Sequence, residues 1–438
     1  MRTRLGSLLS SGRDPVILGS LSAATSLLGF VFQWFMITAL GSGRQTDALF
    51  AGMVVPQLLL TISSGSLIYV LVPMFSVERN ESFYDTFWAL IYTVGILFAV
   101  LAIVLMFTAN WWIPVIVPGF IVEQKHLAVK LVRIQALGIP FIALTSILWS
   151  ASYAKQRYIR AETAPVISAL AGLLMLIWGI PRYGITAAAW AMTVRGVTNC
   201  VLLFPNIDCF KKPTIQKDII IGVWRKLYPL IAGSIYYKTD SLVERYLASS
   251  TPPGQLSILA LARQFYDTGA NVLNRALVSL AIPKMSAMAS NKNWSAFELF
   301  IRKRRAVIMG VVGFSVLAVI IAGKSLISLV FLHRRFESSS AALLWQIMFI
   351  MAFMFAFGVI NDFLASTFYS FGDTVTPTKW IAAVYTLSII LRFAMFFKFR
   401  IYGLAAASSI HAMILSIALF FKLRNAINLR KVDACVSA

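Results

Sequence analysis

Charged and amide side chains lie inside one long apolar segment of this chain, 255–282. Within it, Arg263, Asp267, Asn271 and Asn274 recur at intervals of four, four and three. Residues three and four apart are neighbours on a helix surface, so these side chains form one polar stripe. The planar fork of a guanidinium donates two hydrogen bonds at once, which suits the oxygens of a phosphate or diphosphate.

A second apolar segment, 226–249, also carries charges of both signs. Lys238 and Arg245 are seven residues apart and share a helix face, whereas Asp240 and Glu244 are four apart and share another. Two interpretations remain open. The charges form a salt-bridge network that sets packing between helices, or some of the cations face a wet cavity and bind an anion.

We favour anion binding, because a charge in the bilayer is costly and a network that only packs is replaceable by apolar residues. Arg275, Arg195 and Arg392 are further cations within apolar segments. The chain shows no Walker lysine motif, no Gly-rich phosphate loop and no catalytic triad signature. An enzyme and an ATP-driven pump are therefore not indicated.

The elements that must position these residues are membrane helices. The chain has 438 residues, of which 59% are hydrophobic, more than the roughly 45–50% of soluble proteins. A span needs roughly 20 mainly apolar residues. We expect an all-α polytopic membrane protein with about twelve transmembrane helices, at 15–40, 48–75, 86–108, 127–153, 163–180, 185–205, 226–249, 255–282, 306–332, 339–370, 377–397 and 402–421.

The net charge of +22 does not indicate nucleic-acid binding, because no aromatic residues interleave the basic runs and each run flanks a span. With the N-terminus inside, most cations outside the spans fall on the inner side, which predicts cytoplasmic N- and C-termini in a bacterial inner membrane. The three cysteines have no paired spacing, so neither a disulfide framework nor a metal site is expected.

Two halves of the chain resemble each other. Tyr183-Gly184 and Tyr402-Gly403 each open an Ala-rich span, and Pro73 and Pro283 end corresponding spans. We expect two six-helix bundles around a central cavity, related by an axis along the membrane normal. The predicted domains are an N-terminal bundle, a basic cytoplasmic linker, a C-terminal bundle and a cytoplasmic tail, at 1–205, 206–225, 226–425 and 426–438.

Several motifs, taken in order, resemble the murein lipid II flippase family of the multidrug/oligosaccharidyl-lipid/polysaccharide exporter superfamily. The likeness covers roughly residues 15–425, and its motifs are Ser26-Leu27-Leu28-Gly29-Phe30-Val31, Gly41-Ser42-Gly43, Thr46-Asp47-Ala48-Leu49-Phe50, Pro56, Leu58-Leu59, Val72-Pro73, Pro118-Gly119-Phe120, Val243-Glu244-Arg245 and Thr376-Pro377.

The resemblance implies a flippase that moves a polyprenyl-diphosphate-linked saccharide by alternating access, with no cofactor. It also implies a monovalent cation near Glu244, where sodium and proton coupling stay open. The family's arginine pairs are replaced here by Phe32-Gln33 and Leu60-Thr61, and its Asp-Arg by Arg263-Gln264. These departures, and the absence of two further C-terminal spans, favour a related glycan as much as lipid II itself.

We therefore expect a flippase that carries lipid II or a related cell-envelope precursor. Its partners would be that lipid-linked saccharide, membrane lipid and cell-envelope synthesis enzymes. The alternatives are a drug exporter of the same superfamily and a non-transporting scaffold. Substrate-binding residues are predicted at Arg263, Arg245, Lys238, Arg275, Gln33, Asn271 and Asn274. Coupling or latch residues are predicted at Asp240, Glu244, Asp267 and Arg392.

Overall fold

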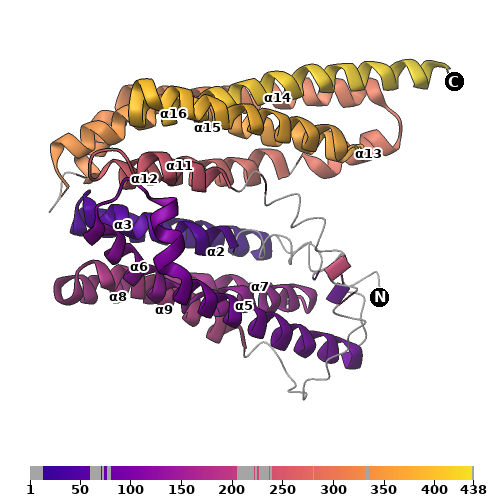
Figure 1. Ribbon diagram of the computed structural model, residues 1–438. Coiled ribbons are helices and arrows are strands. Elements are labelled where there is room, and N and C mark those ends of the chain that lie inside the picture. Colours follow the sequence, from indigo (N-terminus) through magenta and orange to yellow (C-terminus); the bar gives the residue numbers. More distant parts are fainter. Residues whose placement is uncertain are drawn as a thin grey trace. The chain divides into compact units, whose positions relative to one another are not determined.

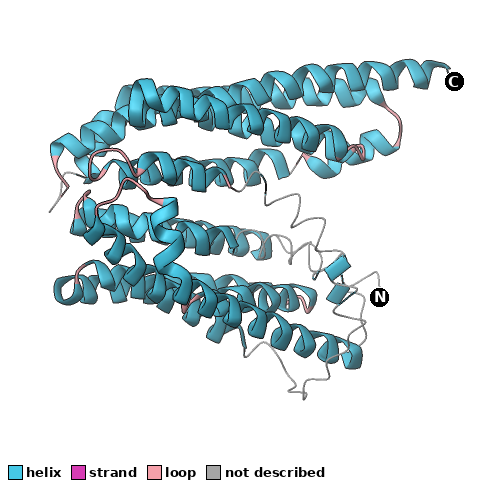
Figure 2. Cartoon of the chain, viewed as in Figure 1, coloured by secondary structure: helices cyan, strands magenta, loops and turns pink. Residues whose placement is uncertain are grey.

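The fold is built from helices throughout the part of the chain that can be described. The computed structural model describes residues 13–59, 71, 74–75, 80–204, 221, 224–225, 236, 239–279, 281–331 and 336–436. Every regular element within these ranges is helical, and no strand occurs in them (Figure 2). The predicted all-α class is confirmed.

The chain divides into two compact units, Met1–Ser250 and Thr251–Ala438. Most of the predicted linker 206–225 lies outside the described ranges, so the predicted domain limits stay a prediction. The helix α11 (Asp240–Ala248) groups with the first unit, although the sequence analysis places it in the second bundle. The reason is that α11 contacts a helix of that unit, α5 (Asn80–Ile116).

Unit 1 is a bundle in which one helix, α8 (Tyr158–Tyr183), packs on two others (Figure 1). These are α2 (Arg13–Leu40) and α9 (Ile185–Leu203). Small residues allow the close approach, because a Cβ added at Gly179 would lie 2.8 Å from the Cβ of Ala187. Besides α5 and α11, this unit also contains α3 (Arg44–Gly52), α6 (Val122–Ala136) and α7 (Ile139–Ala154).

Unit 2 is centred on α15 (Ser338–Ser370), which packs most extensively against three other helices. Two of them, α14 (Trp294–Phe331) and α16 (Val375–Val436), run alongside it in Figure 1. The third is α12 (Gln255–Leu273), which continues into the π-helix η2 (Asn274–Ser279) and then α13 (Ile282–Ser290).

Seven helical stretches in the described ranges are long and apolar enough to cross a membrane. They are Ile17–Leu40, Phe83–Ile116, Val122–Ala154, Tyr158–Tyr183, Trp294–Phe331, Ser338–Ser370 and Val375–Lys431. The last of these covers two predicted spans, 377–397 and 402–421. A non-helical residue, Arg400, separates these two spans within α16. The chain is a multi-pass membrane protein, and the count of twelve stays a prediction.

The two breaks that precede the Ala-rich helices have the same backbone shape. Gly184 has φ 55° and ψ −133°, and Arg400 has φ 50° and ψ −128°. The first break lies at the glycine of its Tyr-Gly pair, Gly184. The second lies at Arg400, three residues before Gly403, so the two Tyr-Gly pairs do not occupy the same backbone position relative to the break. Gly403 is required for another reason, since a Cβ there would lie 2.2 Å from the carbonyl oxygen of Met395.

Candidate functional site

In unit 1, α11 holds a buried pair of opposite charges. Arg245 Nη1 donates to Glu244 Oε1 at 3.2 Å, and the two residues are 9% and 2% exposed. Asp240, in the first turn of α11, is partly exposed. Lys238 lies outside the described residues, so its predicted role is not addressed by the structure.

The C-terminal end of α11 is held by close backbone contact. The backbone N–H of Gly119 donates to Ser249 Oγ at 3.2 Å. A Cβ added at Gly119 would lie 2.5 Å from the carbonyl oxygen of Ser249, so no larger residue fits without a shift. The Pro118-Gly119-Phe120 motif therefore fixes the helix that carries Glu244 and Arg245.

In unit 2, one face of α12 is fixed against α15. The Tyr266 hydroxyl donates to the carbonyl oxygen of Met348 at 2.5 Å, and its ring lies 5.3 Å from that of Phe355. The predicted polar stripe lies on an adjoining face of the same helix. Asp267 and Asn271 are exposed, and Arg263 is partly exposed. The stripe can therefore meet a ligand, which buried packing residues cannot.

The stripe continues into η2, where the helix widens. Asn274 Nδ2 donates to Asp362 Oδ2 on α15 in a short hydrogen bond. Arg304 of α14 donates from Nε and Nη2 to the carbonyl oxygen of Leu277, at 2.9 and 2.7 Å. π-Helical turns are rare and are frequent at functional sites. Arg275, within η2, is exposed, so this turn presents a predicted site cation.

Arg392 is buried inside unit 2, at 2% exposure. Its Nη2 donates to Ser408 Oγ at 3.4 Å, which joins the two arms of α16. Nearby, Asn361 donates to the carbonyl oxygen of Ala412 at 3.0 Å and accepts from Ser416 Oγ at 2.6 Å. Arg392 thus contacts a hydroxyl across the break in α16, and its coupling role stays a prediction.

Gln33 is the site residue predicted on α2. It is 9% exposed, and its Oε1 has no hydrogen-bond partner among the residues that the structure describes. A buried acceptor without a partner costs about 1–3 kcal/mol, so such a group in a membrane bundle calls for a partner. This geometry is compatible with the predicted contact between Gln33 and a hydroxyl-bearing ligand.

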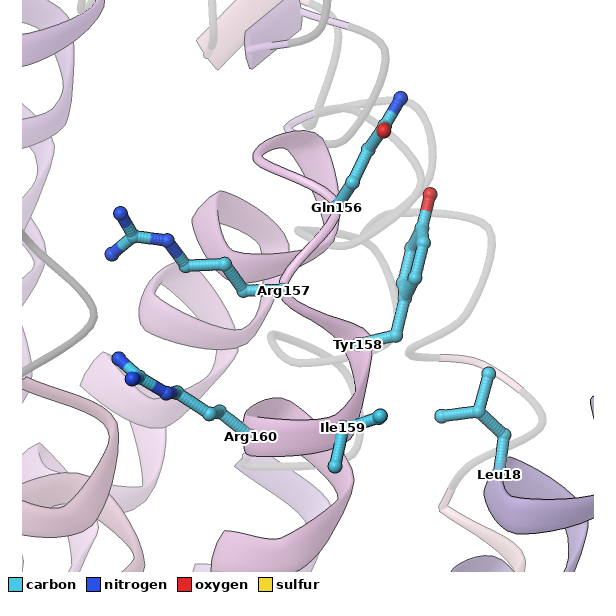
Figure 3. A pocket seen from close by; sticks show the side chains of 6 residues that line it. All are labelled: Leu18, Gln156, Arg157, Tyr158, Ile159 and Arg160. Carbon is cyan, nitrogen blue, oxygen red and sulfur yellow. The ribbon is translucent and has the colours of Figure 1, made fainter. Parts of the chain in front are cut away.

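A separate pocket of about 410 Å³ lies at the corner between α7 and α8, where Leu18 of α2 meets Gln156, Arg157, Tyr158, Ile159 and Arg160 (Figure 3). The corner is tight: Gln156 has φ 59°, and the Arg157 N–H donates to the Ser152 carbonyl oxygen at 2.8 Å. The Arg157 and Arg160 side chains extend to the same side in Figure 3. None of the predicted site residues lines this pocket.

The structure thus brings some of the predicted residues together and leaves others untested. It pairs Glu244 with Arg245 and places Arg263, Asp267, Asn271 and Asn274 along one stripe. Neither Arg304 nor Asp362 was predicted from the sequence as a partner of this stripe. Asp362 stands out as an acid inside an apolar helix, but no sequence pattern links Arg304 to carbonyl groups 27 residues earlier.

Comparison with known proteins gives consistent matches over nearly the whole chain. The family model of the lipid II flippase MurJ matches residues 36–435. The probable lipid II flippase MurJ of Buchnera aphidicola subsp. Baizongia pistaciae is 22% identical over 414 residues, covering 90% of this chain and 80% of the relative. The lipid II flippase MurJ of Burkholderia cenocepacia is 20% identical over 419 residues, with the same two coverages.

Solved structures share the fold. A lipid II flippase MurJ in an inward closed conformation superimposes with a TM-score of 0.82 at 19% identity, covering 96% of this chain and 91% of that one. An inward-facing MATE family transporter of the MOP superfamily gives 0.79 at 11% identity, covering 95% and 98%. The predicted MATE-like architecture is confirmed. Because the family model matches most of the chain, this protein belongs to the lipid II flippase MurJ family, whose members are transporters and not enzymes.

Proposed function

We propose that this protein is a flippase that moves lipid II, or a closely related saccharide on a polyprenyl diphosphate, between the leaflets of a bacterial inner membrane. The observation that carries the proposal is the family match over residues 36–435. The relatives that match over 90% of the chain are named lipid II flippases. Enzymes of cell-envelope synthesis would supply the substrate on the inner side and use it on the outer side.

The polar stripe of α12 and η2 supplies chemistry that suits this cargo. Arg263 and Arg275 donate paired N–H groups of the kind that a diphosphate accepts. Asn271 is exposed one turn from Asp267, where its amide can bond to phosphate or sugar oxygens. No covalent bond changes in this mechanism, since the protein needs to bind the head group and present it to alternate sides of the membrane.

The ion pair of Glu244 supports an internally compensated charge more than a cation site. One of its carboxylate oxygens already accepts from Arg245 at 3.2 Å, so the charge of Glu244 is compensated without a sodium ion. The positive charge of Arg245 can serve where a coupling cation would otherwise bind. Under this proposal the buried pair forms part of the moving framework of unit 1, and transport by this chain does not depend on a sodium gradient.

The test is complementation and transport with matched variants. The wild-type chain should sustain growth of a cell depleted of its own lipid II flippase and move lipid II in vesicles. Arg263→Ala should abolish both while the protein still reaches the membrane in normal amount. The control is Arg182→Ala, which removes an exposed arginine at the end of α8 and should leave transport unchanged.

Two results would overturn parts of the proposal. Full transport by Arg263→Ala would remove Arg263 from the site. Failure of the wild-type chain both to complement and to bind a polyprenyl diphosphate would leave the scaffold alternative. Selective binding of organic cations would instead favour the drug exporter, which shares the fold but is expected to have an acid-rich cavity.

A further inference from the structure

A cation in the middle of unit 1 has no role in the site described so far. Arg195 lies midway along α9 and is partly buried. Within the described part of the chain its guanidinium makes no hydrogen bond and no ion pair. A charge at this depth is costly unless it is paired or faces water. By contrast, the buried carboxylate of Glu244 in the same unit is paired with Arg245 at 3.2 Å.

Arg195 is fixed at the place where three helices converge. A Cβ added at Gly172 of α8 would lie 3.3 Å from the Cβ of Arg195 and 3.5 Å from Cε2 of Phe32 on α2. Gly172 therefore lets α2 and α9 approach the same point of α8. Gln33, the predicted site residue, follows Phe32 directly. The base of the Arg195 side chain is thus held at the junction of α2, α8 and α9.

Two amide oxygens of unit 1, one on α9 and one on α2, also lack hydrogen-bond partners among the described residues. Asn199 lies one turn after Arg195 on α9, and its Oδ1 is buried without a hydrogen-bond partner among the described residues. Gln33 Oε1 is in the same condition, in a residue more than nine-tenths buried. Asparagine and glutamine amide oxygens accept hydrogen bonds, and most buried acceptors in native structures are satisfied.

Other residues of α9, Thr193 and Gly196, are packed or bonded against neighbouring helices. The Thr193 hydroxyl donates to the carbonyl oxygen of Ile134 at 2.9 Å. Gly196 lies close to Ile142, since an added Cβ would be 2.7 Å from Cγ1 of that side chain. Thr193 and Gly196 are thus bonded or closely packed, whereas Arg195 and Asn199, on another face of α9, have unused hydrogen-bonding capacity.

We propose that Arg195, Asn199 and Gln33 form a second head-group subsite, in unit 1, for a phosphate that carries a sugar. The guanidinium supplies donors and a positive charge for phosphate oxygens. The two amide oxygens accept from hydroxyl groups, which a bare diphosphate does not have. A sugar phosphate matches both demands at once. This subsite rests on the proposed function and assigns part of its substrate recognition to unit 1.

Binding to the purified full-length protein in detergent tests the subsite. The probes are a polyprenyl diphosphate and the same lipid carrying one sugar, with binding followed by native mass spectrometry. Arg195→Gln should weaken binding of both probes by about tenfold or more, because a charge-assisted contact is lost. Arg195→Lys should recover part of that affinity. Asn199→Ala should weaken the sugar-bearing probe by about fivefold and leave the bare diphosphate unchanged.

The control and the contrary results separate this subsite from the general function. Arg182→Gln, at the exposed end of α8, should bind both probes like the wild type. If the wild type binds and Arg195→Gln binds equally well, the subsite is wrong and the flippase proposal stands. If the wild type binds neither probe, the flippase proposal itself fails. Should Arg195→Gln not fold, Asn199→Ala decides, since an equal effect on both probes would overturn the subsite.

Discussion

Arg304 shows how one side chain can hold an irregular turn in place. A π-helix shifts each hydrogen bond by one residue and leaves carbonyl groups poorly matched. Arg304 reaches from α14 and donates to the Leu277 carbonyl oxygen at 2.9 and 2.7 Å, and to that of Ala276 at 3.4 Å. Asn274, at the start of the same turn, is held by Asp362. The turn that presents Arg275 is thus fixed from two sides.

Replacing Arg304 by Met should destabilise unit 2. The apolar variant keeps most of the side-chain volume but leaves the Leu277 carbonyl without its charged donor. The expected loss is about 1.5–3 kcal/mol, the range for a hydrogen bond to a charged group. Thermal unfolding of the purified protein in detergent measures it as a lower melting temperature.

Arg302→Met is the matched control, because Arg302 belongs to the same basic run and is exposed. Its melting temperature should stay close to that of the wild type. Equal destabilisation by both variants would mean that loss of charge at the membrane surface matters, and that the contacts with η2 do not.

At the level of single residues, the sequence predicted residue types and helix faces better than partners. The stripe from Arg263 to Asn274 follows from the helical repeat alone, and the structure leaves it accessible on α12. In the sequence, Arg304 is one of four consecutive cations, Arg302-Lys303-Arg304-Arg305, a basic run of the kind that indicates topology. Its actual contact depends on a local widening of another helix, which no spacing in its own segment records.

Among the elements, the two breaks before the Ala-rich helices are the sharpest test of backbone requirements. Both have positive φ with strongly negative ψ, a region that glycine adopts readily and other residues rarely do. Glycine fills the first break, at position 184, whereas an arginine fills the second, at position 400. A residue held in such a region costs about 1–3 kcal/mol.

Gly184→Ala should lower the melting temperature, and Arg400→Gly should leave it unchanged or raise it. In Gly184→Ala a Cβ is forced into the disfavoured region, at a cost of about 1–3 kcal/mol. In Arg400→Gly that strain is relieved, while a cation–π contact with Phe396 at 5.7 Å is lost, which is worth about 0.5–1 kcal/mol. Thermal unfolding in detergent compares the two variants directly.

Gly310→Ala gives the reference for adding a methyl group without strain. Gly310 lies within α14, and an added Cβ would meet nothing within 4 Å, so this variant should be neutral or slightly more stable. A decrease at Gly310 as large as that at Gly184 would show that the break at 184 does not demand glycine.

Hydropathy predicted the positions of the membrane helices well, but it did not predict where the backbone of a helix is broken. The described helices overlap the predicted spans, because apolar length is the main requirement for crossing a membrane. The offset between the break at Arg400 and the Tyr402-Gly403 pair was not visible, since arginine gives no signal of positive φ. The close approach of Gly119 to Ser249 was likewise hidden in a loop motif.

For the whole molecule, composition and family evidence answer different questions. The apolar content and charge pattern predicted a multi-pass membrane protein, and the helical stretches agree. The nature of the cargo followed from the ordered motifs and from the family match over residues 36–435. Net charge of +22 alone fits several kinds of protein, so the distribution of cations relative to the spans is what carries topology.

That distribution makes a prediction about the two ends of the chain. With most cations of the connecting segments on the inner side, both termini are predicted to face the cytoplasm. The chain carries a natural probe, since Cys435 lies near the C-terminus and Cys200 is buried in α9 at 1% exposure. Cys209 falls in the predicted inner linker. Replacing Cys200 and Cys209 by Ser leaves Cys435 as the reporter thiol.

In intact spheroplasts, a membrane-impermeant maleimide should not label Cys435, and lysis should make it reactive. As the control, Pro253→Cys in the same background adds a thiol to the exposed turn before α12, which is predicted on the outer side and should react without lysis. If Cys435 reacts in intact spheroplasts and position 253 does not, the orientation is reversed. The run Arg302-Lys303-Arg304-Arg305 would then lie outside, where the positive-inside bias does not place such a run, and the inner-to-outer direction proposed for transport would lose its basis.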